Sequence, residues 1–150
     1  MSFPRQVNIV EVAPRDGLQN ERRLLSTATK IDFINQFSET GLTRIESGSF
    51  VSAKRVPQMA DSGHVLRGIK RNPGTVYSAL TPNMAGLETA IAAGADEVAA
   101  FAAASEAFSQ KNINCTISES IQRFEPVLRV AQEHELPVRG YVSCVLGCPF

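Results

Sequence analysis

Side chains whose types could do chemistry gather near the start of the chain, directly after a short apolar run. The apolar residues at positions 7, 9, 10 and 12 predict a buried strand. Pro14 and Gly17 then end that strand and begin a loop. The strand end and this loop carry two carboxylates, a guanidinium and an amide: Glu11, Asp16, Arg15 and Gln19.

Asp16 and Arg15 together predict a site that binds a divalent cation and an anionic group side by side. The Asp16 carboxylate is a hard oxygen ligand of the kind that Mg²⁺ or Mn²⁺ prefers. Arg15 offers a fixed fork of hydrogen-bond donors to a carboxylate or a developing oxyanion. The simpler interpretation is a surface ion pair at a strand end, which stabilises a fold only weakly. The segment by itself leaves both interpretations open.

The rest of the chain alternates predicted strands and helices, so the elements that position this site belong to an α/β fold. Further strands are predicted over residues 43–47, 76–80, 97–102 and 138–143. Apolar spacing and capping residues predict four helices between them, with Asn83 as one N-cap and Thr116 and Glu119 as a capping box for the last. In that last helix the apolar stripe is Ile121, Phe124, Leu128 and Ala131. No linker interrupts the series, so we expect one domain over residues 1–150.

Two architectures fit five parallel strands and four helices. One is a doubly wound, flavodoxin-like sheet, and the other is the first half of a (β/α)₈ TIM barrel, which needs about 250 residues when complete. The sequence ends soon after the fifth predicted strand, with no helix to cover it. Polar residues also follow several strand ends, where barrel active sites are built. Both observations favour the half barrel, with its C-terminal half absent from this sequence.

The segment over residues 11–21 resembles the metal-binding signature of the hydroxymethylglutaryl-CoA lyases. These lyases belong to a wider family of metal-dependent barrel enzymes that make or break carbon–carbon bonds. The resemblance continues in register along the chain, through residues 45–52, 56–59, 104–108, 112–115 and 139–144. It implies that Asp16 is a metal ligand, and that Arg15 and Glu46 are catalytic. Glu11 would orient the site from behind. Four residues would contact substrate: Gln19, Ser49, Tyr141 and Ser143. Lys111 and Asn112, in a loop after the fourth predicted strand, would approach the CoA portion.

The implied reaction is cleavage of 3-hydroxy-3-methylglutaryl-CoA to acetyl-CoA and acetoacetate, a step of leucine degradation and ketone-body formation, with Mg²⁺ or Mn²⁺ as cofactor. In the family, the other metal ligands are a His-x-His pair and a further side-chain oxygen, and these, like the proton-carrying cysteine, would belong to later segments. His64 and His134 stand too far apart to be that pair, and neither Cys144 nor Cys148 is the catalytic thiol. A related acyl-CoA-condensing synthase or pyruvate-linked aldolase is the enzymatic alternative. A complete, non-catalytic binding module is the alternative of another class.

Composition narrows the classes of partner. The formal net charge is zero and the basic residues are scattered, so nothing predicts a nucleic acid or an anionic membrane as partner. The N-terminus resembles neither a signal nor a transit peptide. We therefore expect a cytoplasmic enzyme with an acyl-CoA substrate, reduced cysteines and a homo-oligomeric assembly.

Overall fold

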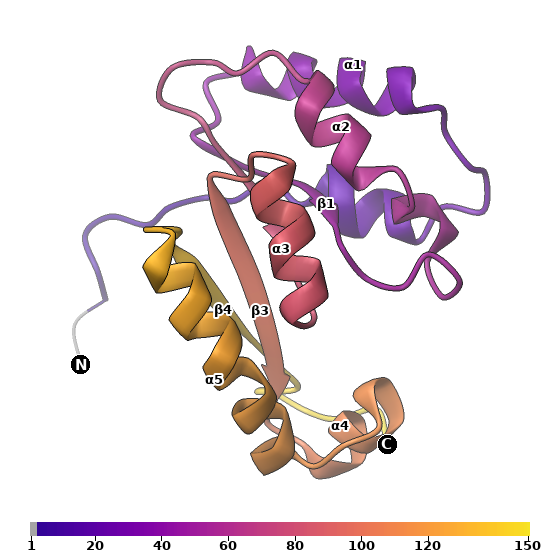
Figure 1. The fold of residues 1–150 in the computed structure, drawn as a ribbon, viewed down its shortest axis with the longest axis vertical. Helices are drawn as coiled ribbons and strands as arrows, with labels where there is room; N and C mark the ends of the chain where they lie inside the picture. The colour runs from indigo at the N-terminus through magenta and orange to yellow at the C-terminus, as the bar shows by residue number, and fades with distance from the viewer. Residues whose placement is uncertain (1–2) are drawn as a thin grey trace.

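The structure, a computed structural model, describes residues 3–150 as a parallel four-stranded sheet with helices along one face (Figure 1). The strands lie side by side in chain order: β1 (Arg44–Ser49), β2 (Val76–Leu80), β3 (Glu97–Ala103) and β4 (Val138–Ser143). The helices are α1 (Thr27–Ser38), α2 (Ser62–Gly68), α3 (Met84–Ala92), α4 (Glu106–Ile113) and α5 (Ile117–Glu133). Two single turns, η1 (Ala13–Gly17) and η2 (Pro57–Met59), complete the elements. Within the described range no helix is both long and apolar enough to cross a bilayer.

Local sequence signals start the helices where they were predicted. Asn83 accepts a hydrogen bond from the Gly86 amide at 2.9 Å and begins α3. Thr116 and Glu119 form the complete capping box of α5, each side chain satisfying a backbone amide of the other residue. Ser26, which the sequence analysis did not single out, begins α1 by accepting a hydrogen bond from the Thr29 amide at 3.1 Å. These bonds satisfy amides that the first helical turn leaves without partners.

The core lies between the helices and one face of the sheet, in two clusters. The first joins α1 and α2 to β1 and β2 around Ile34, Ile45 and Tyr77. The second joins α3 and α5 to β3 around Leu87, Val98 and Phe124, and Figure 1 shows β3 running between these two helices in the view. Because successive strand residues point to opposite faces, the neighbours of these core residues point away from the helices. We call this second surface of the sheet the polar face.

The predicted first strand over residues 7–12 is wrong. Glu11 alone pairs there, in an isolated parallel bridge with Ile45 of β1. Val7 and Ile9 are 75% and 68% exposed. The apolar pattern is present, but in residues 3–150 this edge of the sheet has no second layer to bury it, and apolar side chains order a strand only when they are packed.

Two helix predictions also need correction. Lys111 and Asn112, predicted to lie in a loop, belong to α4 (Glu106–Ile113), which Ser105 caps by accepting a hydrogen bond from the Phe108 amide. In α5 the buried residues are Ser120, Phe124, Val127 and Ala131, so only half of the predicted stripe is correct. Ile121 and Leu128 are 55% and 47% exposed. The helix is rotated by about one residue because Phe124 and Val127 face β3, a contact that periodicity does not reveal.

Gly48 allows β1 to pass close to α2. The pairing of β1 with β2 shifts by one residue between Glu46 and Gly48. A Cβ at Gly48 would lie 2.8 Å from the Cβ of Ser62, closer than side-chain carbons pack. Ser62 in turn accepts the Ser49 amide at 3.0 Å. This irregularity sets the direction of the last residues of β1, beside the candidate site.

Candidate active site

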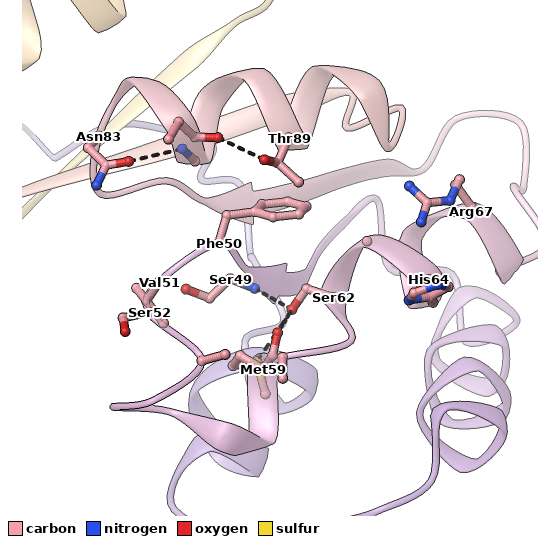
Figure 2. A pocket seen from close by; sticks show the side chains of 15 residues that line it. Ser49, Phe50, Val51, Ser52, Met59, Ser62, His64, Arg67, Asn83 and Thr89 are labelled. Atoms are coloured by element: carbon pink, nitrogen blue, oxygen red, sulfur yellow. Dashed lines mark hydrogen bonds between the residues drawn. The ribbon is translucent and has the colours of Figure 1, made fainter.

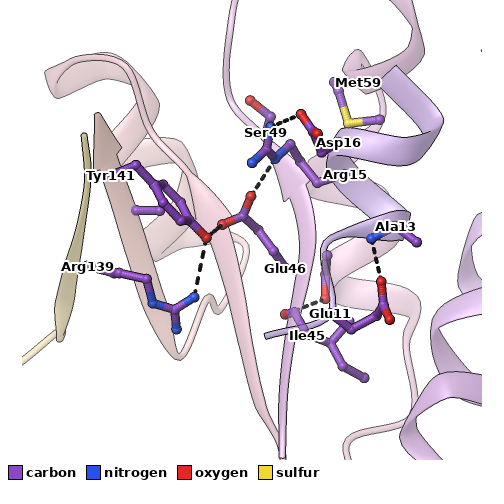
Figure 3. Close-up of polar contacts among 12 residues, drawn as sticks. Glu11, Ala13, Arg15, Asp16, Ile45, Glu46, Ser49, Met59, Arg139 and Tyr141 are labelled. Carbon is purple, nitrogen blue, oxygen red and sulfur yellow. Dashed lines mark hydrogen bonds and ion pairs between the residues drawn. The ribbon is translucent and has the colours of Figure 1, made fainter. Parts of the chain in front are cut away.

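Glu11 fixes η1 against the end of β1. Its backbone bonds to both sides of Ile45, from the Glu11 amide to the Arg44 carbonyl at 3.0 Å and from the Glu46 amide to the Glu11 carbonyl at 2.8 Å. Its side chain accepts the Ala13 amide at 2.7 Å, at the start of the π-helical turn. Both the backbone and the side chain of Glu11 therefore bond to backbone groups, and these bonds orient the turn that carries Arg15 and Asp16 (Figure 3).

Arg15 lies between two carboxylates. Its Nε donates to Oε1 of Glu46, and its Nη1 lies 2.6 Å from Oδ1 of Asp16. The Glu46 side chain is fully buried, whereas that of Asp16 is 54% exposed. A buried carboxylate requires partners of this kind, because desolvating it alone costs several kcal/mol. The ion pair with Glu46 thus fixes the orientation of the Arg15 guanidinium, and the exposed carboxylate of Asp16 lies beside it.

Tyr141, in the strand at the opposite edge of the sheet, provides the second hydrogen bond to the Glu46 carboxylate. Its hydroxyl donates to Oε2 of Glu46 at 2.8 Å. Burial raises the pKa of Tyr141, and the hydrogen bond and negative charge of Glu46 raise it further, against a lowering contribution from Arg139. Tyr141 is therefore a neutral hydrogen-bond donor at physiological pH.

Behind Tyr141, a second carboxylate joins two more arginines. Glu97 begins β3 and is buried, and it accepts Arg44 of β1 at 2.5 Å and Arg139 of β4. Arg139 also donates from Nη1 to the Tyr141 hydroxyl at 3.4 Å. One continuous polar network therefore crosses the polar face, with three guanidinium groups and three carboxylates: Arg15, Asp16, Arg44, Glu46, Glu97 and Arg139.

Sequence reasoning missed Arg44, Glu97 and Arg139. A signal was available for Arg139, because it precedes Tyr141 by two positions and so shares its strand face. Nothing local marked Glu97, whose role depends on partners in β1 and β4.

The other predicted substrate residues lie at strand or turn ends. Gln19 is half-buried just after η1, and Ser143 is half-buried at the end of β4. Ser49 ends β1, and its hydroxyl is buried without a hydrogen-bond partner among the described residues. Ser49 also borders an open pocket of about 470 Å³ between the end of β1, α2 and α3, which Phe50, His64, Arg67 and Asn83 help to line (Figure 2).

Lys111 and Asn112 lie in α4 and not in a loop, which corrects their predicted setting. Both are exposed, and the Lys111 ammonium lies 3.9 Å from the centre of the Phe150 ring. The cysteines are free thiols, and Cys148 accepts the Ser105 hydroxyl at 2.9 Å. The structure does not bring these residues together with the Arg15 network.

Asp16 fits one position of a divalent-cation site. Its carboxylate is exposed and anionic, and hard oxygen donors suit Mg²⁺ and Mn²⁺. Across residues 3–150, however, no three His, Cys, Asp or Glu side chains cluster closely enough to hold a metal ion. The described residues therefore offer Asp16 as one candidate ligand and do not bring a full set of candidate ligands together.

Three curated proteins that are similar to this chain carry the names of lyases. A 3-hydroxy-3-isohexenylglutaryl-CoA/hydroxy-methylglutaryl-CoA lyase of Pseudomonas aeruginosa is 57% identical over 150 residues, all of this chain and 50% of that protein. The mitochondrial hydroxymethylglutaryl-CoA lyase of Homo sapiens and the cytoplasmic lyase of Mus musculus are each 58% identical, over 99% of this chain and 46% and 43% of their own lengths. The chain thus spans about half the length of the curated relatives it matches.

Solved structures give the same result for the fold. The crystal structure of the Pseudomonas aeruginosa lyase superposes with a TM-score of 0.95 at 57% identity, over 100% of this chain and 50% of that one. A lyase from Acinetobacter baumannii, in complex with coenzyme A and 3-methylmalate, superposes at 0.92 with 37% identity, over 100% and 49%. The parallel sheet is therefore part of a TIM-barrel fold, as predicted, and the doubly wound alternative is wrong. Because a family model described as HMGL-like matches residues 6–148, the chain belongs to the HMGL-like family.

Proposed function

We propose that residues 1–150 are the N-terminal half of a single TIM-barrel domain, and that the complete protein is a hydroxymethylglutaryl-CoA lyase. It would cleave 3-hydroxy-3-methylglutaryl-CoA to acetyl-CoA and acetoacetate. The observation that carries the proposal is the fixed placement of Arg15 by buried Glu46 beside the open carboxylate of Asp16. The sequence identity to lyases over the whole chain supports it.

The reaction needs a place for negative charge. Removal of the substrate's tertiary hydroxyl proton lets that oxygen form the ketone of acetoacetate as the carbon–carbon bond breaks. The bonding electrons become the enolate of acetyl-CoA, which a proton then quenches at carbon. Arg15 would stabilise the enolate oxygen, because a preorganised donor is most effective where charge develops. Glu46 binds the guanidinium directly, and Tyr141 fixes the orientation of the Glu46 carboxylate.

Asp16 would hold the divalent cation, either Mg²⁺ or Mn²⁺, together with ligands from the rest of the barrel. When bound, the cation supplies Lewis-acid polarisation of the substrate oxygens. Glu11 would keep Asp16 in position through η1. Four residues would contact the substrate: Gln19, Ser49, Tyr141 and Ser143.

The acyl-CoA class of substrate is supported by the coenzyme A complex of the Acinetobacter baumannii lyase. We propose that Lys111 and Asn112, exposed on α4, approach the CoA portion. A cytoplasmic location is supported by the name of the Mus musculus relative, although the Homo sapiens relative is mitochondrial. We further propose a homo-oligomer that needs neither membrane nor nucleic acid.

The test is an assay of the full-length protein with 3-hydroxy-3-methylglutaryl-CoA, in the presence of Mg²⁺ or Mn²⁺. We expect acetyl-CoA and acetoacetate in equal amounts. Incubation of acetyl-CoA with 2-oxo acids, and of pyruvate with aldehydes, serves as the matched test of a synthase or an aldolase. Condensation without cleavage would replace the lyase by one of these enzymes. No turnover of any of these substrates would favour a binding module.

A further inference from the structure

Arg139 connects the two buried carboxylates of the polar network, Glu97 directly and Glu46 through Tyr141. Its Nη2 donates to buried Glu97. Its Nη1 donates to the Tyr141 hydroxyl at 3.4 Å (Figure 3). The Arg139 side chain is 19% exposed, so both contacts lie largely out of solvent. This residue therefore lies between two acidic groups, Glu97 on one side and, through Tyr141, Glu46 on the other.

The direction of the hydrogen bonds follows from what each group can do. A guanidinium has donors only, so Arg139 must use a lone pair of the Tyr141 oxygen. The single hydroxyl hydrogen is then left for an acceptor, and the structure places Oε2 of Glu46 at 2.8 Å. Arg139 also donates to Glu97, the second buried carboxylate of the network, through its other terminal nitrogen, Nη2.

We propose that Arg139 is a positioning residue that directs the Tyr141 hydroxyl to Glu46 and thereby holds Arg15 in its reactive orientation. The proposal rests on the lyase function proposed above, in which Arg15 stabilises the enolate. Glu46 accepts Tyr141 on one oxygen and Arg15 on the other, so a tyrosine that turns away leaves the carboxylate held from one side only. The guanidinium group of Arg15 would then be held less rigidly.

The raised pKa of Tyr141 agrees with this role. Burial and the interaction with Glu46 keep the hydroxyl protonated, so its hydrogen remains available to donate. An ionised tyrosine could not hold a carboxylate.

The experiment is a double-mutant cycle with Arg139→Lys and Tyr141→Phe in the full-length protein. Lysine keeps the charge opposite Glu97 but offers one nitrogen in place of two fixed ones. We expect R139K to lower kcat about tenfold with KM within about twofold, and to change kcat less than about twofold when Tyr141 is already Phe. Arg71→Lys is the matched control, because Arg71 also binds a carboxylate, Asp96, and a second acceptor, yet lies outside the network.

Equal effects of R139K in both backgrounds would overturn the inference, because a residue with a merely structural role does not depend on the tyrosine hydroxyl. A second readout does not require activity. The NMR resonance of the Tyr141 Cζ carbon, assigned by its loss in Y141F, should move in R139K and stay in place in R71K. An unmoved resonance would also overturn the inference. If the unmutated protein fails to cleave the substrate, the proposed function is wrong, and this resonance alone decides whether Arg139 positions Tyr141.

Discussion

Tyr141 and Glu46 bond across the sheet at 2.8 Å although they belong to its two opposite edge strands. Neighbouring strands lie about 4.8 Å apart, so three such spacings would separate β1 from β4 by about 14 Å in a flat sheet. The two side chains meet because the sheet curves around its polar face. This curvature is what a barrel requires, and it turns a set of scattered strand residues into one site.

Arg15→Lys should lower turnover by about a hundredfold to a thousandfold, the usual effect of losing one preorganised donor to a developing oxyanion. Lysine keeps a cation beside Glu46, so the melting temperature should change little. Steady-state kinetics and a thermal melt of the full-length protein measure the two effects. Near-normal turnover would remove Arg15 from the catalytic residues.

Asp16→Asn should raise the concentration of Mg²⁺ or Mn²⁺ needed for half-maximal activity, because a formal charge is lost from a hard oxygen ligand. Asp32→Asn is the matched control, since Asp32 is exposed on α1 and bonds only to Gln36 among its described contacts. A titration of activity against each metal gives the midpoints. An unchanged midpoint in D16N would mean that Asp16 is a surface partner of Arg15 and no more.

Asp61→Asn should reduce stability in a manner that depends on pH. Burial raises the pKa of Asp61, but hydrogen bonds from Lys30 and Thr27 and the charge of Lys30 outweigh this effect and lower it. A carboxyl whose pKa is lower in the folded state stabilises the protein above its unfolded pKa, and this contribution is lost as the pH falls through the folded value. We expect D61N to cost about 2 kcal/mol at neutral pH.

The same comparison in acid provides the check on Asp61. Once the pH lies below the lowered pKa that Asp61 has in the folded protein, Asp61 is protonated in both states, and the unmutated protein and D61N should unfold with similar free energies. Denaturant melts at several pH values test this. A difference that persists unchanged into strong acid would assign the effect to packing and not to the ion pair of Asp61 with Lys30.

Residues 1–150 expressed alone should show no cleavage of 3-hydroxy-3-methylglutaryl-CoA and should self-associate. They contain one candidate metal ligand, Asp16. They also leave the outer edge of β4, most of the outer edge of β1 and the apolar side chains of Ile121, Leu128 and Val142 exposed. Size-exclusion chromatography with an acetyl-CoA assay tests both expectations. A monomer with robust activity would contradict the proposal that these residues are half of one domain.

Local features of the sequence predicted much of the fold. The strands at 76–80 and 138–143 have the predicted bounds, and Asn83 and Thr116 begin α3 and α5. Such signals succeed because capping bonds and strand patterning involve residues close in sequence. The Arg15–Asp16 pair was recognisable for the same reason, and the resemblance along the chain supplied the family.

The tertiary structure alone decided the rest. The residues at 7–12 carry a strand pattern but pair only at Glu11, because burial of that pattern requires neighbours and not periodicity. The inward face of α5 depends on its contact with β3. Arg139 and Glu97 join the site through partners up to 53 residues away, and Tyr141 reaches Glu46 across 95. Adjacent residues can reveal a possible ligand or donor, but only a curved sheet can bring these distant charges together and compensate the cost of burying them.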